Sequence, residues 1–227
     1  MRNIKKKRYL IAFILTVFIF VFGIMVGLVM ESQRVQFVQD KAYEQKLDYR
    51  SLQFQYQFID QLSQENNCPV LANALNVNLE TLEDTRIRLT NYNLDAKISK
   101  DDFEMLYRDY ILSQLNYWLL AKKARELCNF ELATILYFFS TDKDCPDCGE
   151  QAFILTYLKN LFGDKLLNFA LNSQFRDEKS LELLMETYSI NVFPTLLIEG
   201  RKFEGLAEKQ TILREICKHY KDMEECY

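Results

Sequence analysis

The stretch Leu132-Ala-Thr-Ile-Leu-Tyr-Phe-Phe139 is a short apolar run that leads, through the polar segment 140–144, into Cys145-Pro146-Asp147-Cys148. A run of this length and composition is typical of a buried strand. The residues that follow, 149–162, carry apolar side chains at helical spacing, and we expect these five to form the buried face of a helix: Phe153, Ile154, Tyr157, Leu158 and Leu161. The sequence therefore predicts a strand, a turn with two cysteines, and a helix.

Strands and helices continue to alternate after this helix. Apolar runs predict strands over residues 166–171, 192–200 and 201–205, and helical patterns predict helices over 178–188 and 207–221. The predicted order is β-α-β-α-β-β-α, which makes residues 129–227 one domain of the α/β class.

The two cysteines of the turn point to a specific chemistry. Because Cys145 and Cys148 are separated by two residues at the start of a helix, their sulfurs can approach closely enough to form a disulfide. The unpaired N–H groups of a helix N-terminus favour the thiolate form of the first thiol, and the thiolate is the attacking species in disulfide exchange. We therefore expect Cys145 to be the exposed, attacking thiol and Cys148 to be the more buried, resolving thiol.

The chain from Leu132 to Tyr220 resembles the thioredoxin superfamily. The resemblance rests on the apolar strand with its C-P-D-C turn, on Ile190-Asn-Val-Phe-Pro194-Thr195-Leu196, and on the segment from Gly200 to Gly205. It implies a thioredoxin-like fold with a cis proline beside the redox pair, and a protein thiol–disulfide oxidoreductase that needs no metal or organic cofactor. The substrates would be cysteine-containing proteins or a redox partner protein. The residues implied in substrate binding are Phe193, Pro194 and Thr195.

The sequence departs from the usual pattern of that family near the cysteines. Asp144, and not an aromatic residue, precedes the first cysteine, and Tyr137 occupies the strand position that often carries a buried acid. Four acidic residues, offset only by Lys143, give this segment a net charge of −3: Asp142, Asp144, Asp147 and Glu150. Because negative charge beside a thiolate destabilises it, we expect a stable disulfide, which favours a reductase or isomerase over a strong oxidant.

Two other interpretations of the motif remain open. Cys-Pro-Asp-Cys-Gly is also the form of a zinc knuckle, but a closed site would need two further ligands, for which only Cys217, Cys226 and His219 are available downstream. Alternatively, the domain has the fold without catalysis and is an interaction or assembly module with a structural disulfide. The long amphipathic helix after the motif and the Phe193-Pro194-Thr195 segment favour redox chemistry over zinc.

The other four cysteines are candidates for structural disulfides. Cys68 and Cys128 lie at a predicted helix break and near a predicted helix end, and Cys217 and Cys226 bracket a charged segment at the C-terminal end. Four cysteines allow three different pairings, and the sequence does not choose among them.

The N-terminal part of the chain has a long uncharged run. Tyr9–Met30 comprises 22 residues without a charge, and five basic residues precede it. At about 1.5 Å per residue the run spans roughly 33 Å, which predicts an uncleaved transmembrane helix within residues 1–30 and not a removed signal peptide. The basic flank predicts a single-pass membrane protein with a cytoplasmic N-terminus and an extracytoplasmic C-terminal domain, where disulfides are permitted.

Residues 31–128 show helical patterns and nothing that looks catalytic, so we expect a helical spacer between the anchor and the domain over residues 129–227. Apolar residues at three- and four-residue steps within 31–65 would pack on the later helices or on a second chain. Residues 23–59, which begin with a G-x-x-x-G spacing, are the candidate contact for a homodimer. Asn91-Tyr-Asn93 predicts a loop between two helices.

The charge balance argues against nucleic acid as a partner. The chain has 28 Lys and Arg against 32 Asp and Glu, and five of the basic residues lie in residues 2–8. Residues 31–227 therefore carry a net charge of 23 − 32 = −9. Nucleic-acid binding needs clustered cations, so no such partner is expected. A single histidine, His219, also argues against His-based metal sites and His-dependent catalysis.

Overall fold

The computed structural model describes residues 10–26, 68–94, 100–141, 143–175, 178–221 and 223–226. The chain divides into two compact units, Met1–Asp60 and Gln61–Tyr227. The domain boundary expected after residue 128 does not separate two units, because the helices before it and the sheet after it belong to the same unit. The apolar seam within residues 31–65, the homodimer contact beyond residue 26 and Asp142 lie outside the described residues.

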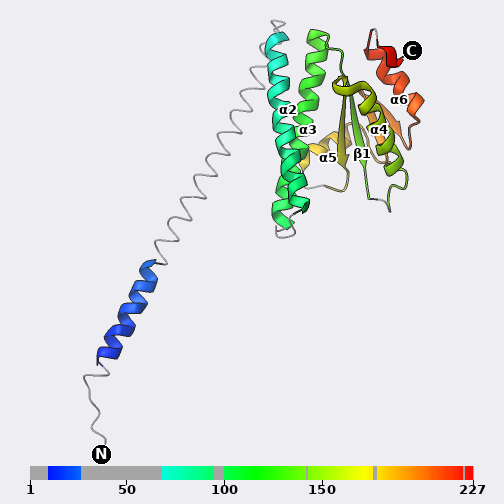
Figure 1. Cartoon of the computed structure of the whole chain (residues 1–227). Helices are drawn as coiled ribbons and strands as arrows, with labels where there is room; N and C mark the ends of the chain where they lie inside the picture. The colour runs from blue at the N-terminus through cyan, green and yellow to red at the C-terminus, as the bar shows by residue number, and fades with distance from the viewer. Residues whose placement is uncertain are drawn as a thin grey trace, which may run out of the picture. The chain divides into compact units, whose positions relative to one another are not determined.

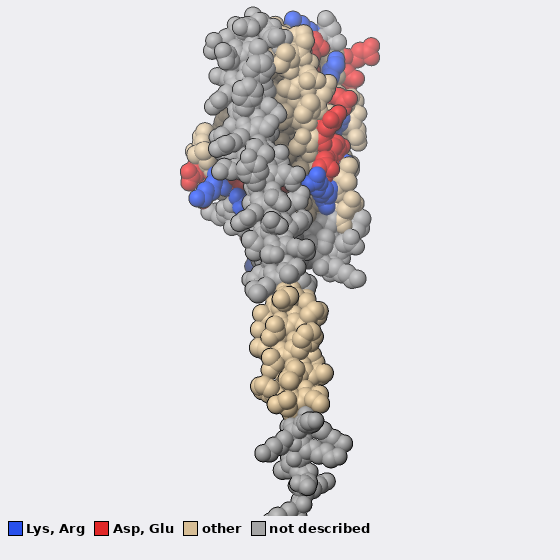
Figure 2. Space-filling model, turned by 90° about the vertical axis from the view of Figure 1, so that its left-hand side faces the viewer, with Lys and Arg blue, Asp and Glu red and all other residues tan. Residues whose placement is uncertain are grey.

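In the first unit the described residues are 10–26, which form one helix. Its side chains are exposed and include no Lys, Arg, Asp or Glu (Figure 2). In the part of the chain that the structure describes, no helix is both long and apolar enough to span a bilayer. This finding contradicts the N-terminal transmembrane helix of the predicted fold class and the predicted single-pass membrane localisation.

The second unit begins with two helices, α2 (Cys68–Leu94) and α3 (Lys100–Cys128), which pack side by side (Figure 1). A disulfide between Cys68 and Cys128 joins the first residue of α2 to the last residue of α3. The loop predicted at Asn91-Tyr-Asn93 is wrong, because α2 continues through Leu94. Asparagine weakens a helix but does not end it here, since no glycine or proline follows to start another backbone conformation.

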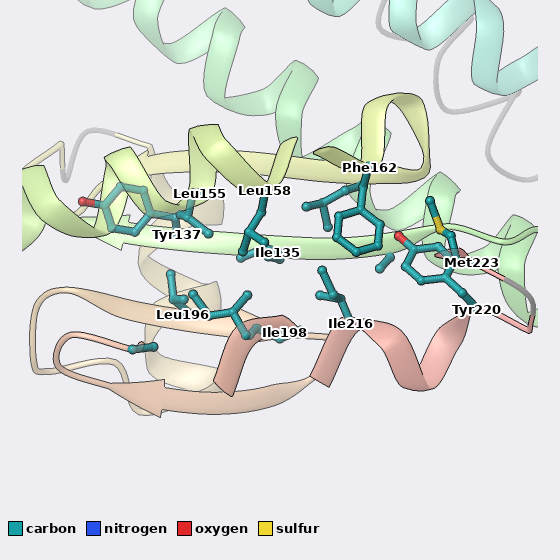
Figure 3. Close-up of a cluster of buried hydrophobic side chains, with 14 of the residues drawn as sticks. Ile135, Tyr137, Leu155, Leu158, Phe162, Leu196, Ile198, Ile216, Tyr220 and Met223 are labelled. Atoms are coloured by element: carbon teal, nitrogen blue, oxygen red, sulfur yellow. The ribbon is translucent and has the colours of Figure 1, made fainter. Parts of the chain in front are cut away.

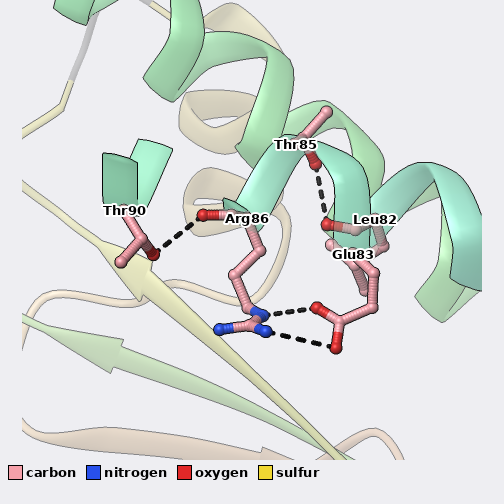
Figure 4. Close-up of polar contacts among 5 residues, drawn as sticks. All are labelled: Leu82, Glu83, Thr85, Arg86 and Thr90. Carbon is pink, nitrogen blue, oxygen red and sulfur yellow. Dashed lines mark hydrogen bonds and ion pairs between the residues drawn. The ribbon is translucent and has the colours of Figure 1, made fainter. Parts of the chain in front are cut away.

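Much of the polar bonding of α2 is local to the helix itself (Figure 4). The hydroxyls of Thr85 and Thr90 donate to the carbonyls of Leu82 and Arg86 at 2.9 Å each. The Arg86 guanidinium also pairs with the carboxylate of Glu83, one turn earlier. These contacts stabilise the helix but do not tie it to the rest of the unit.

A four-stranded sheet with the order β2-β1-β3-β4 follows the two helices. Its strands are β1 (Ala133–Phe139), β2 (Leu166–Asn172), β3 (Thr195–Ile198) and β4 (Arg201–Glu204). The remaining α-helices are α4 (Cys148–Phe162), α5 (Lys179–Thr187) and α6 (Lys209–Ile216). β1 pairs parallel with β2 and antiparallel with β3, and β3 pairs antiparallel with β4. Along the chain the elements run β1, α4, β2, α5, β3, β4, α6.

The central strand β1 is buried on both faces. Successive side chains of a strand point to opposite faces, and residues 133 to 138 are all buried. Ile135 and Tyr137 join the apolar cluster formed with α4 and α6, which runs along β1 from Tyr137 at one end to Tyr220 and Met223 at the other (Figure 3). Burial on both faces explains why the sequence of this strand is a continuous apolar run and not an alternating one.

Ion pairs connect α3 to the sheet region. Arg108 Nε lies 3.3 Å from Glu178 Oε2, just before α5, and Arg125 pairs with Glu199 at the end of β3. Burial alone would raise the pKa of the Glu178 carboxyl, but hydrogen bonds from Ser180 and Arg108 outweigh it, and the pKa lies below its ordinary value. The helix α3 is thereby fixed against the same body that carries the cysteine turn.

Candidate active site

Cys145 and Cys148 are joined by a disulfide, with their Cα atoms 5.4 Å apart, where the chain passes from β1 to α4. Cys148 is the first residue of α4, and its backbone N–H donates to the Cys145 carbonyl at 3.2 Å. Both residues belong to the apolar cluster on the α4 side of the sheet, where Cys145 is 1% exposed and Cys148 5%. The expectation that Cys145 is the more exposed of the two is wrong for this disulfide form, because the chain before it turns back and places it in the cluster.

The loop that leads into Cys145 is held by a residue from a distant segment. Gln174, in the turn after β2, donates from Nε2 to Ser140 Oγ at 2.9 Å and to Asp144 Oδ2 at 3.0 Å. Thr141 Oγ1 donates to the same Asp144 oxygen at 2.9 Å, and the backbone N–H of Cys145 donates to the Thr141 carbonyl at 2.9 Å. Two donors therefore partly compensate the charge of the carboxylate that precedes the disulfide.

Tyr137 contacts the start of α4. Its hydroxyl donates to the carbonyl oxygen of Cys148 at 2.6 Å. Burial raises the pKa of this phenol to about 12, so it stays protonated at neutral pH. It therefore supplies a hydrogen-bond donor beside the disulfide and does not accept a proton from a cysteine.

The proline turn lies at the same edge of the sheet as the cysteine turn. The Phe193–Pro194 peptide bond is cis, and the next residue, Thr195, lies opposite Phe138, one residue before the end of β1. Thr195 Oγ1 donates to the Val192 carbonyl at 2.6 Å, and Phe193 packs against the cluster that contains both cysteines. The structure thus brings together the site residues predicted from the sequence: Cys145, Cys148, Phe193, Pro194 and Thr195.

Gln151 contributes to this site, although the sequence analysis did not single it out. It lies three residues after Cys148 and is fully buried. Its Oε1 accepts from the backbone N–H of Ala207 at 2.8 Å, and its Nε2 donates to the Ala207 carbonyl at 3.5 Å. Nearby, the N–H of Gly205 donates to the Pro194 carbonyl at 2.8 Å. Hydrogen bonds therefore connect the first turn of α4 and the proline turn to one segment after β4.

The buried face predicted for α4 is only partly right: Leu158 is buried and Ile154 packs against the cluster, but three of the five predicted residues, Phe153, Tyr157 and Leu161, are exposed. Phe153 is 75% exposed and Tyr157 46%. The residues that α4 buries are Cys148, Gln151, Leu155, Leu158 and Phe162. Both sets follow helical spacing, and the polar Gln151 interrupts the true face in the sequence, so the apolar pattern alone favours the wrong one.

We expect Gln151→Leu to lower the free energy of unfolding by about 2–3 kcal/mol, because it leaves the buried N–H and carbonyl of Ala207 without partners. Urea denaturation of the full chain, followed by circular dichroism, measures this loss. The matched control is Gln210→Leu, at an exposed position of α6, which should change stability by less than about 0.5 kcal/mol. Equal effects of the two substitutions would contradict the assigned role of Gln151.

All six cysteines are paired. The remaining disulfides join Cys68 to Cys128 and Cys217 to Cys226, each with Cα atoms 5.6 Å apart. The second of these occupies the two downstream thiols that a zinc knuckle would need. Within the described ranges, no group of three or more His, Cys, Asp or Glu side chains is arranged to hold a metal ion. Burial, with the nearby charge of Arg125, lowers the pKa of His219, which is half-buried and not a fully exposed surface residue.

Comparison with known proteins adds no assignment. No protein-family model matches the chain, and no curated protein matches it. A solved structure described as "Structure of a malarial protein" is 19% identical, and the match covers 39% of this chain and 97% of that one with a TM-score of 0.32. A likeness at this level supports no conclusion about fold or function.

Proposed function

We propose that this protein is a thiol–disulfide oxidoreductase that acts on cysteine-containing proteins through Cys145 and Cys148. The observation that carries the proposal is the Cys145–Cys148 disulfide at the first turn of α4, at the same sheet edge as the Phe193-Pro194-Thr195 turn. A cysteine pair at a helix start supplies a nucleophile and a resolving thiol together. The resemblance of these two segments to the thioredoxin superfamily supports the same assignment.

The exchange proceeds in two steps that conserve atoms, electrons and protons. In the reduced protein, the Cys145 thiolate attacks one sulfur of a substrate disulfide, forms a mixed disulfide and releases the other substrate sulfur as a thiolate that takes up a proton. The Cys148 thiol then loses its proton and attacks Cys145 Sγ, which forms the Cys145–Cys148 disulfide and releases the second substrate thiol. The substrate gains two electrons and two protons, and the cysteine pair loses them.

Access to Cys145 requires a movement of the loop before it, because this residue is almost fully buried in the disulfide form. The hydrogen bonds from Gln174 to Ser140 and Asp144 hold that loop, so they are the contacts that a substrate would displace. Exposed Asp147 and Glu150 add negative charge beside the pair, which disfavours the thiolate. These features favour a reductase or isomerase over a strong oxidant.

A redox titration of the full chain tests the proposal. The protein is equilibrated in glutathione and dithiothreitol buffers, and free thiols are alkylated and identified by mass spectrometry. We expect Cys145 and Cys148 to interconvert reversibly at a midpoint nearer to about −230 mV than to the roughly −120 mV of strong oxidants, while the Cys68–Cys128 pair stays oxidised. A high midpoint would reverse the proposed direction. A pair that never converts would favour the alternative, a non-catalytic interaction or assembly module.

A further inference from the structure

A cavity of about 360 Å³ lies between α5 and the segments that flank the candidate active site. Its apolar wall is formed by Phe175, Leu181, Met185 and Ile190, of which Leu181 and Ile190 are buried. This volume falls within the range of roughly 300–1,000 Å³ that is usual for ligand pockets. It is large enough to take one long side chain.

Two carboxylates line the same cavity. Glu182 and Glu186 are one helical turn apart on α5, and both are exposed. Neither makes an ion pair with another residue in the described ranges. Among the described cations, Arg108 pairs with Glu178, and Lys202 donates to the Ser189 carbonyl and pairs with Glu204. Lys179, which lies on α5 three residues before Glu182, forms no ion pair with it. Within the described ranges, the cavity therefore combines an apolar wall with two carboxylates that form no ion pair.

The cavity adjoins both halves of the candidate active site. Ser173 lines it, and the backbone N–H of Ser173 donates to the carbonyl of Phe139, the last residue of β1, at 2.9 Å. The next residue, Gln174, holds the loop that leads into Cys145. On the other side, Asn191 lines the cavity three residues before Pro194, so their Cα atoms are at most about 11 Å apart. An extended segment rises about 3.3 Å per residue, so a segment bound at Pro194 reaches the cavity within a few residues.

We propose that this cavity binds the side chain of a lysine or arginine that lies within a few residues of the reacting cysteine in a protein substrate; the inference rests on the proposed function. The methylene stem of such a side chain packs on the apolar wall, and its charged end pairs with Glu182 and Glu186. A neutral apolar side chain would use the wall alone, and an acidic one would be repelled. The substrate class is therefore a basic segment around a cysteine.

Paired peptide substrates test this specificity with the reduced full chain. Each peptide contains one cysteine, disulfide-linked to a small thiol reporter, and either lysine or norleucine at one position two to five residues from the cysteine. Norleucine keeps the stem and lacks the charge. We expect kcat/KM to be about five- to tenfold higher for lysine at the best position, and this ratio to fall toward one in the Glu182→Gln/Glu186→Gln variant.

A matched variant and a second substrate separate the possible failures. Glu80→Gln/Glu224→Gln makes the same change of net charge at exposed positions outside the cavity lining and should keep the lysine preference. A ratio near one at every position, with bis(2-hydroxyethyl) disulfide still reduced by the protein, would overturn the cavity assignment and leave the proposed function intact. A preference that survives the Glu182/Glu186 double substitution would also overturn it. Failure to reduce either kind of substrate would overturn the proposed function and this inference with it.

Discussion

The Cys148→Ser variant of the full chain is expected to accumulate a mixed disulfide with its substrate, whereas Cys145→Ser should accumulate none. In the proposed exchange, Cys145 forms the first bond to the substrate, and without Cys148 no internal thiol resolves it. Both variants should lose catalytic turnover below detection, because the two-electron exchange needs both sulfurs. Non-reducing gels and mass spectrometry of the protein, after incubation with a disulfide-containing protein substrate and acid quenching, measure the trapped species.

The control for this experiment removes a disulfide away from the turn. Cys217→Ser/Cys226→Ser lacks two thiols but keeps the proposed reactive pair, so it should turn over substrate and accumulate no long-lived mixed disulfide. If the Cys145→Ser variant instead accumulates a mixed disulfide through Cys148, then Cys148 is the attacking thiol and Cys145 the resolving one. If Cys148→Ser traps nothing while remaining folded, the catalytic assignment is wrong and the module interpretation takes its place.

Removal of the Cys68–Cys128 disulfide should cause a large loss of stability. In the loop-entropy description, a bridge between residues 60 positions apart contributes about 4 kcal/mol. The bridge joins the first residue of α2 to the last residue of α3, and these two helices also pack on each other, so the loss should come mainly from the greater entropy of the unfolded chain. We expect Cys68→Ala/Cys128→Ala to lower the free energy of unfolding by about that amount, as measured by urea denaturation of the oxidised full chain.

The shorter disulfide offers an internal comparison. Cys217 and Cys226 are nine positions apart, for which the same description gives about 3 kcal/mol. Cys217→Ala/Cys226→Ala should therefore cost less than removal of the longer bridge. If the order of the two losses is reversed, the packing of Cys217 and Cys226 against the apolar cluster, and not loop closure, determines their contribution.

Strand positions were the most predictable part of the fold. The apolar run at 132–139 corresponds to β1, because burial on both faces demands apolar residues at every position. The buried face of α4 was not predictable from apolar spacing, because Phe153 and Tyr157 form a second stripe that the structure leaves exposed. At the N-terminus, the uncharged run suggested a membrane helix, but no helix among the described residues is both long and apolar enough to span a bilayer.

The parts of the candidate site that lie within two short motifs were predictable from the sequence. The parts that depend on contacts between distant segments were not. The cysteine pair and Pro194 can be identified from their immediate neighbours. The burial of Cys145 could not be predicted, because it depends on a loop held by Gln174, which lies 30 residues from Asp144. Gln151 and the cavity carboxylates were missed for a related reason, since a lone glutamine or two glutamates on a helix are common on any protein surface.

The disulfide pattern has a consequence for how the chain is made. The six cysteines pair in their order along the sequence, 68 with 128, 145 with 148 and 217 with 226, so no bridge crosses another. During synthesis from the N-terminus, Cys68, Cys145 and Cys217 each have as correct partner the next cysteine to emerge. At about 5–20 residues per second, Cys128 follows Cys68 within roughly 3–12 s, before any competing thiol is made. Oxidation in step with synthesis therefore produces the native bridges without breaking a wrong one.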